Sequence, residues 1–266
     1  MSQKEDKITF AQKERYSLED LFTLVRILRS PDGCHWDRAQ THASVRKNLI
    51  EETYEVADGI DRDDPEALRE ELGDYLFEGA FHIVLEEERG RFTTEDVTSA
   101  LCRKMIARHP HVFSPDTGVS GQAVVDDWEK MKKAEKKQNT LAETLAAVPR
   151  TLPALMYAKK LTSRAAGVGF TYESPEEGAQ KVKEEWGELS AASTEKERFE
   201  EYGDLLLALV NYGRLLGLDA EEALEAASQK FRTRLVEMEK NLEKNNKNLS
   251  NCTKSELLAA WDKIKK

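Results

Sequence analysis

One sequence pattern occurs twice in this chain and sets the strongest limit on its fold. Glu-Glu-x-Gly-Asp-x-Leu occupies residues 70–76 and again residues 200–206, and each copy continues into an apolar run. A helix face that only meets solvent does not need such a run beside its acids, so the pattern indicates helices that pack against other elements. The repeat therefore predicts two similar helical units in tandem.

Each copy follows another acidic set at helical spacing, within residues 51–55 and 184–188. Residues three or four apart share one face of a helix. The stretch between the two sets leaves room for one helix to end and the next to begin. Two antiparallel helices would then bring four carboxylates to one point. In the second half these are Glu185, Glu188, Glu201 and Asp204.

Carboxylates gathered in this way repel one another unless protons or cations neutralise them. Oxygen ligands alone favour a hard divalent ion, so Mg²⁺ is the expected cofactor and Mn²⁺ its substitute. A single acidic pair at helical spacing is more often an exposed, solvated face. The occurrence of the whole pattern in both halves favours the metal site.

Length and composition agree with a helical protein. The chain has 266 residues, enough for one large domain or two of about 110–130 residues. With 14 glycines, 7 prolines and few alternating β-branched runs, an all-α fold is expected. A net charge of −10 argues against a stable complex with nucleic acid, whose phosphates need a positive surface.

The cysteines and the distribution of apolar residues indicate a cellular location. Cys34, Cys102 and Cys252 are odd in number and lack metal-ligand spacing, which is typical of a reducing cytosol. No apolar stretch resembles a signal peptide or a membrane span. We therefore expect a cytoplasmic protein that does not enter a membrane.

The chain should alternate helices and short loops. A capping box at Ser17 and Asp20 should start the first helix, Cys34 to Asp37 should form a loop, and His109-Pro110-His111 should end a helix, although those histidines could also be a metal pair. A Lys-rich exposed helix is expected at residues 130–137. The predicted domains are residues 17–113 and 149–242, with a connector at 114–148 and a tail helix within 243–266.

Several motifs, taken in order, closely resemble the MazG family of nucleoside triphosphate pyrophosphohydrolases in its two-domain form, over roughly residues 17–262. The motifs of the first half are Asp37-x-x-Gln-Thr-His, Glu51-Glu52-x-x-Glu55, residues 69–74 and Arg108-His109-Pro110-His111-Val112-Phe113. Those of the second half are residues 149–155, Gly167-Val168-Gly169-Phe170, residues 184–204 and Lys230-Phe231-x-x-Arg234.

The resemblance implies an all-α homodimer that hydrolyses nucleoside triphosphates to a monophosphate and pyrophosphate with Mg²⁺, in house-cleaning or control of the nucleotide pool. It implies that Glu185, Glu188, Glu201 and Asp204 are metal ligands. It also implies that Glu184 binds metal through water or helps to activate the attacking water, and that Lys181, Lys230 and Arg234 contact phosphates. The matching residues of the first half are Glu52, Glu55, Glu71 and Asp74, with Glu51, Lys104 and Arg108 beside them.

Two further expectations concern the ligand and its site. Trp36, Phe170 and Tyr172 lie before the acidic helices and could stack on a base or pack in the protein. The second half has Lys181 where the first has Asn48, so we expect the second half to be the main catalytic unit.

Two other classes of protein are alternatives to the enzyme. A di-iron carboxylate bundle needs Glu-x-x-His pairs, and no histidine of this chain has a glutamate three residues before it. A non-catalytic helical protein that senses nucleotides remains the alternative function, and release of pyrophosphate separates it from the enzyme.

Overall fold

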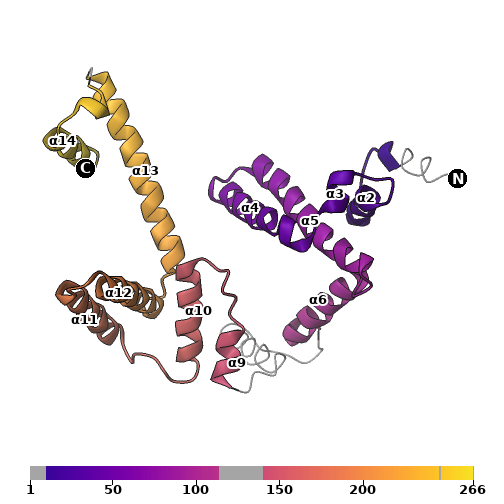
Figure 1. The fold of residues 1–266 in the computed structure, drawn as a ribbon, viewed down its shortest axis with the longest axis horizontal. Helices are drawn as coiled ribbons and strands as arrows, with labels where there is room; N and C mark the ends of the chain where they lie inside the picture. The colour runs from indigo at the N-terminus through magenta and orange to yellow at the C-terminus, as the bar shows by residue number, and fades with distance from the viewer. Residues whose placement is uncertain (1–9, 114–139, 246, 266) are drawn as a thin grey trace. The chain divides into compact units, whose positions relative to one another are not determined.

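The computed structural model describes residues 10–113, 140–245 and 247–265. Every regular element in these ranges is a helix, which confirms the all-α prediction (Figure 1). The chain divides into two compact units, Met1–Glu129 and Lys130–Lys266. The predicted domain boundaries stay predictions, and the Lys-rich helix expected at residues 130–137 lies outside the described ranges.

The first unit begins with α2 (Leu18–Arg29), and the capping box of Ser17 and Asp20 is present as predicted. The prediction of a loop at Cys34 to Asp37 is wrong, because His35–Ala39 forms the short helix α3. A helix of this length has no stability of its own. Arg29 from α2 donates hydrogen bonds to the carbonyl oxygens of Asp37 and Gln40, so a tertiary contact satisfies the end of α3.

Helices α4 (His42–Asp61) and α5 (Pro65–Glu88) form an antiparallel hairpin. Thr41 and Ser44 cap α4 reciprocally, while Asp64 caps α5 and Pro65 occupies its first turn. The buried core lies where α2 packs against this hairpin and contains Phe22, Val25, Val45, Phe81 and Val84.

Helix α6 (Thr94–Arg108) ends at His109, as predicted. Residues Pro110–Phe113 then form the short helix α7. His109 is the C-cap of α6 and its backbone N–H donates to the carbonyl oxygen of Ile106, which supports the interpretation of this motif as a helix end.

The second unit repeats the hairpin. Helix α9 (Leu141–Ala146) precedes α10 (Ala154–Ala166). Proline disfavours helical backbone at the residue before it, so α10 does not extend back beyond Pro153. Helices α11 (Pro175–Ala191) and α12 (Glu195–Leu215) form the hairpin, and α10 packs against α12 and α13.

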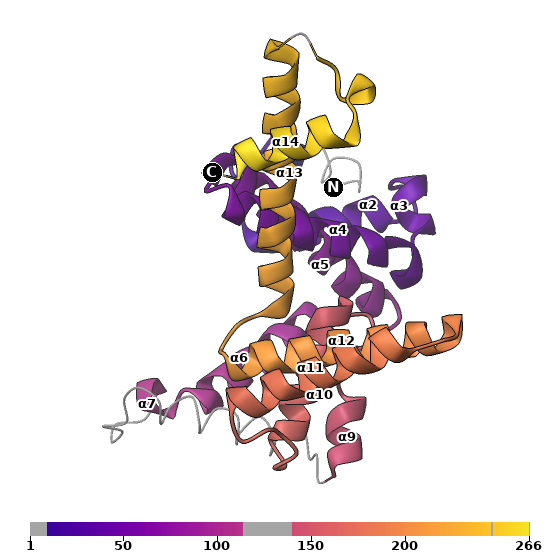
Figure 2. The same cartoon turned by 90° about the vertical axis from the view of Figure 1, so that its left-hand side faces the viewer.

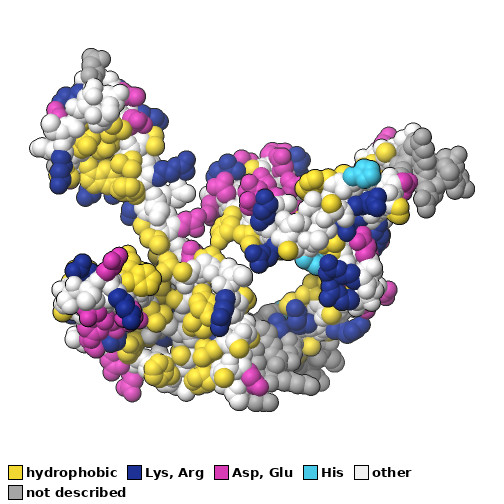
Figure 3. All heavy atoms as spheres, in the orientation of Figure 1, with side chains coloured by type: hydrophobic (Ala, Val, Ile, Leu, Met, Phe, Trp, Pro, Cys, Tyr) yellow, Lys and Arg dark blue, Asp and Glu magenta, His cyan; other side chains and the backbone are white. Residues whose placement is uncertain are grey.

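Helix α13 (Ala220–Lys244) leads through the short 3₁₀ helix η1 (Leu249–Asn251) to α14 (Lys254–Ile264), which crosses it (Figure 2). Exposed apolar side chains gather over α13 and α14 (Figure 3). Among the described residues, no helix combines the length and the apolar character that crossing a bilayer requires.

Candidate metal and nucleotide site

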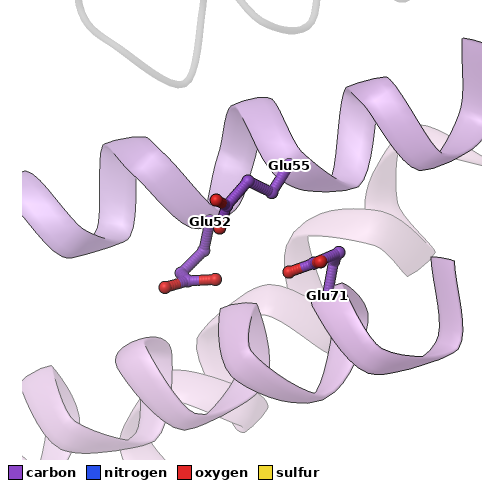
Figure 4. A group of neighbouring side chains, drawn as sticks. All are labelled: Glu52, Glu55 and Glu71. Carbon is purple, nitrogen blue, oxygen red and sulfur yellow. The ribbon is translucent and has the colours of Figure 1, made fainter. Parts of the chain in front are cut away.

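The α4–α5 hairpin brings carboxylates from both helices together. Glu52 and Glu55 on α4 face Glu71 on α5, and one carboxylate oxygen from each lies within 4.8 Å of the others (Figure 4). Glu52 and Glu55 share a face because they are three residues apart, and the hairpin turn reverses the chain so that α5 meets that face.

The α11–α12 hairpin does the same in the second unit. Carboxylate oxygens of Glu185, Glu201 and Asp204 lie within 4.8 Å of one another. Glu185 is only 6% exposed, so it is an ionisable group in the packed seam rather than on the solvent face. A buried carboxylate without compensation is unfavourable, which separates this group from an ordinary acidic surface.

Six of the eight predicted metal ligands lie in these two tight groups, and the other two, Asp74 and Glu188, act on them electrostatically. Burial, followed by the charges of Glu55, Asp74 and Glu71, raises the pKa of Glu52 to about 7. Burial, followed by the charges of Glu188 and Asp204, raises the pKa of Glu201.

These shifts show what the sites require. A raised carboxyl pKa means that the ionised form lacks sufficient positive charge nearby. All the ligand atoms are carboxylate oxygens, the donors that hard divalent cations prefer. The donor set therefore fits a divalent metal ion in each unit.

In the second hairpin a lysine lies among the carboxylates, whereas in the first the charge of Arg62, at the end of α4, acts on Glu71. Lys181 Nζ lies 2.7 Å from Glu185 Oε1 and donates a 2.9 Å hydrogen bond to Glu184 Oε1. Hydrogen bonds to these two carboxylates raise the pKa of Lys181, which keeps it charged. The matching residue of the first unit, Asn48, instead donates a 3.4 Å hydrogen bond from Nδ2 to Glu78 Oε1.

In each hairpin, one position on each helix lies one helical turn further from the connecting turn than the carboxylate group. We call these two positions the inner rung. In the first unit it consists of Asn48 and Glu78, four residues before Glu52 and four after Asp74. In the second unit the matching positions hold Lys181 and Ala208.

The other predicted phosphate contacts lie apart from the carboxylates. Lys230 is exposed and Arg234 half-buried on α13, which extends away from the α11–α12 hairpin (Figure 1). On α6, Lys104 is exposed and Arg108 is buried. No ion pair joins Lys104, Lys230 or Arg234 to an acidic side chain in the part of the chain that the structure describes, so their roles stay predictions.

The aromatic candidates differ in burial. Trp36 is 62% exposed and Phe170 is 80% exposed, so neither packs in its own unit, whereas Tyr172 is half-buried. Exposed rings remain available for stacking on a base.

Sequence reasoning missed a buried polar network on α5. Glu86 bonds His42 Nε2 and accepts hydrogen bonds from Arg89 and Arg91. The Nδ1 atoms of His42 and His82 lie 2.7 Å apart, and the two rings stack. Glu78 and His82 follow Asp74 at four-residue steps on one helix face, which is the signal that could have found them.

Comparisons with known proteins identify the family. A model of the MazG nucleotide pyrophosphohydrolase domain matches residues 40–113, which include the first hairpin. The nucleoside triphosphate pyrophosphohydrolase/pyrophosphatase MazG of Thermotoga maritima is 40% identical over 93% of this chain and 95% of its own length. A nucleoside triphosphate pyrophosphohydrolase of Escherichia coli K12 is 37% identical over 94% of this chain and 97% of its own. The chain therefore belongs to the MazG family.

Proposed function

We propose that this protein is an enzyme that hydrolyses nucleoside triphosphates between the α- and β-phosphates, giving a nucleoside monophosphate and pyrophosphate. The single observation that carries the proposal is the pair of convergent carboxylate groups, each built from two antiparallel helices. The relatives from Thermotoga maritima and Escherichia coli, which match along nearly their whole length, carry names that state this activity.

We assign Mg²⁺ to the carboxylate groups, with Glu185, Glu188, Glu201 and Asp204 as its ligands in the second unit. Bound Mg²⁺ supplies charge neutralisation for the phosphates and lowers the pKa of a water molecule. Lys181 would bind a phosphate oxygen, since its ammonium already lies among the carboxylates. Glu184, whose side chain is 53% exposed, would orient Lys181 and assist the attacking water.

We propose the second unit, with domain limits near residues 149–242, as the main catalytic domain. A triphosphate brings about four negative charges, and an additional cation beside the metal ligands suits it. The first unit, near residues 17–113, has an intact carboxylate group but a neutral asparagine and a buried acid at its inner rung. That arrangement favours nucleotide binding without rapid hydrolysis as the role of the first unit.

A homodimer in the cytoplasm completes the proposal. Trp186, Phe199, Tyr202 and Phe231 expose 55–81% of their surface in the second unit, and exposed apolar residues in such number support an interface between copies. Cys34, Cys102 and Cys252 are free thiols, as a reducing compartment favours.

The test is pyrophosphate release from a panel of nucleoside triphosphates, with Mg²⁺ and with a chelator. We expect release only with the metal. Glu201→Gln should lower the rate about 100-fold or more, because it removes a charged metal ligand from the catalytic unit. The matched variant, Glu71→Gln, should leave most of the activity.

Circular dichroism would establish that both variants are folded. If no triphosphate in the panel released pyrophosphate, the proposal of an enzyme would be wrong and a nucleotide sensor would be favoured. Loss of activity in Glu71→Gln with normal activity in Glu201→Gln would instead assign catalysis to the first unit.

A further inference from the structure

The turn of the first hairpin carries an arginine beside the carboxylate group. Arg62 is the C-cap of α4, and its backbone N–H donates to the carbonyl oxygen of Asp58. Its side chain pairs with the same residue, with Arg62 Nε 3.1 Å from Asp58 Oδ2. The guanidinium therefore points back along α4 toward the carboxylate group, as side chains on a helix tilt toward its N-terminus.

Helical spacing places this ion pair on the face of α4 that carries the metal-ligand candidates. Asp58 follows Glu55 by three residues and Arg62 follows it by seven, which are spacings of one helix face. One row of charged side chains thus continues from the carboxylate group to the end of the helix.

Close packing at the turn holds this end of α4 against α5. Gly59 is buried, and a Cβ there would lie 3.2 Å from Leu68 Cα, closer than ordinary van der Waals contact. The two backbones therefore meet one turn beyond Glu55 and just before Glu71. Burial and the neighbouring acids raise the pKa of Glu71, and the charge of Arg62 opposes that rise, which agrees with this proximity.

The Arg62 side chain can exchange its partner at little cost. Arg62 is 55% exposed and Asp58 62% exposed, and an ion pair in solvent contributes little free energy. A guanidinium matches the oxygens of a phosphate in a planar, bidentate arrangement. A phosphate that extends from the carboxylate group toward the turn can therefore displace Asp58 and accept two hydrogen bonds.

The second hairpin differs at this end. Helix α4 continues about one turn further past its carboxylate group than α11 does. At the turn of the second hairpin, Arg198 donates hydrogen bonds to the backbone carbonyl oxygens of Ala192 and Ser193. The two units thus place a cation at opposite ends of the same carboxylate frame, with Lys181 at the inner rung of the second and Arg62 at the turn of the first.

We propose that Arg62 binds the terminal phosphates of a nucleoside triphosphate in the first unit and so sets its preference for a triphosphate over a monophosphate. The proposal rests on the proposed function, in which the carboxylate group holds a metal-bound nucleotide. The metal holds the phosphates that lie at the carboxylates, and Arg62 meets those that extend toward the turn. A triphosphate brings about four negative charges, so a cation beyond the metal suits its tail.

The experiment uses the full chain with Glu201→Gln, which removes a metal ligand of the second unit. Calorimetry with saturating Mg²⁺ measures the binding of AMP and of the non-hydrolysable α,β-methylene analogue of ATP. Addition of Glu71→Gln identifies the binding that depends on the first carboxylate group. Arg62→Gln should weaken binding of the analogue about tenfold, the effect of one charge-assisted contact, and change that of AMP by less than about twofold.

Three controls separate a phosphate contact from a structural role. Arg62→Lys keeps the charge and should weaken binding of the analogue by only about threefold or less. Arg103→Gln, at an exposed arginine of α6 whose charge acts on Asp96, should bind like the parent. Mn²⁺ binding without nucleotide should be unchanged or tighter in Arg62→Gln, because the lost charge repels a cation. Thermal melts monitored by circular dichroism show that each variant is folded.

An equal loss for AMP and for the analogue would mean that Arg62 only supports the carboxylate group, and it would overturn the inference. Unchanged binding of the analogue in Arg62→Gln would also overturn it, as would the absence of nucleotide binding that depends on Glu71. Pyrophosphate release by the chain with Glu201 and Arg62 intact judges the proposed function separately, because that release does not require a phosphate preference of the first unit.

Discussion

The two hairpins are built alike, but they differ at the inner rung. In both, acids from antiparallel helices come within 4.8 Å, and burial with mutual repulsion raises carboxyl pKa values. One turn deeper, the first unit has Asn48 bonded to a buried glutamate, whereas the second has Lys181 paired with Glu184 and Glu185. The same helical frame thus gathers carboxylates twice, and the inner rung adds a lysine in the second unit but an asparagine and an acid in the first.

This difference is the basis of the different tasks that we propose for the two units. A lysine beside the carboxylates offers a phosphate a charge-assisted hydrogen bond, which is roughly twice as strong as a neutral one. An asparagine facing an acid offers the same phosphate no positive charge. Under the roles that we propose, catalysis in the second unit and nucleotide binding in the first would require changes at the rung but not in the hairpin.

Among the residues that differ between the two units, the largest expected effect comes from exchanging those of the rung. Lys181→Asn should lower kcat/KM for pyrophosphate release about 10–100-fold, because a charged contact that stabilises the transferring phosphates is lost. Asn48→Lys should leave this activity nearly unchanged, since it alters only the first unit. Steady-state kinetics with Mg²⁺ in excess would measure both.

The exchange has a conservative control. Lys181→Arg keeps the charge and should retain more activity than Lys181→Asn, with any loss due to the geometry of the planar guanidinium. If Lys181→Asn were fully active, the rung would not distinguish the units, and the comparison between them would fail.

A smaller effect is expected at the glycines that precede each hairpin. A Cβ at Gly33 would lie 2.3 Å from the carbonyl oxygen of Leu28 and 2.4 Å from that of Ile27, and backbone cannot move aside cheaply. Gly169 has φ +89° but open space around it. We expect Gly33→Ala to destabilise the first unit by about 3 kcal/mol and Gly169→Ala to cost the second about 1–2 kcal/mol.

Urea unfolding, followed by hydrogen exchange that resolves the two units, would measure these free energies. Each substitution should affect its own unit. An equal cost at the two glycines would mean that close backbone approach in the first unit is relieved by a shift of α2.

Much of this architecture could be predicted because it depends on local pattern. Capping boxes, proline at a helix start and acids at helical spacing act within a few residues. Helix α3 was missed since it depends on Arg29, a contact outside its own sequence. Glu78 was missed for the same reason. The burial of a glutamate beside an apolar run can be inferred only when its hydrogen-bond partner on α4 is known.

The cations on α13 show a further limit of sequence reasoning. Spacing places Lys230 and Arg234 on one face of a helix, but it does not tell where that helix points. In the described part of the second unit, α13 contacts α10, α12 and α14, and it carries both residues away from the hairpin. Local periodicity fixes a face, whereas tertiary packing fixes its neighbours.

The smallest effect concerns the ion pairs that anchor each unit. Arg26 and Thr94 bond Glu87 and lower its pKa from 4.5 to about 2, while Lys159 lowers the pKa of Asp219 from 3.8. A carboxyl group with a depressed native pKa adds stability above its unfolded pKa and loses it as the pH falls. Glu87 should therefore begin to lose its contribution below about pH 4.5, before Asp219 does so below about pH 3.8.

Matched variants isolate these two contributions from those of other acids. The stability difference between the parent chain and Glu87→Gln should shrink as the pH falls from 5 toward 2, and only in the first unit. Asp219→Asn should give the same behaviour in the second unit at lower pH. Unit-resolved hydrogen exchange at several pH values, corrected for intrinsic rates, measures both. Because the Arg26 side chain is 39% exposed and Lys159 36% exposed, solvent screening keeps both effects modest. A difference that stayed constant with pH would show that Arg26 and Thr94 do not lower the native pKa of Glu87.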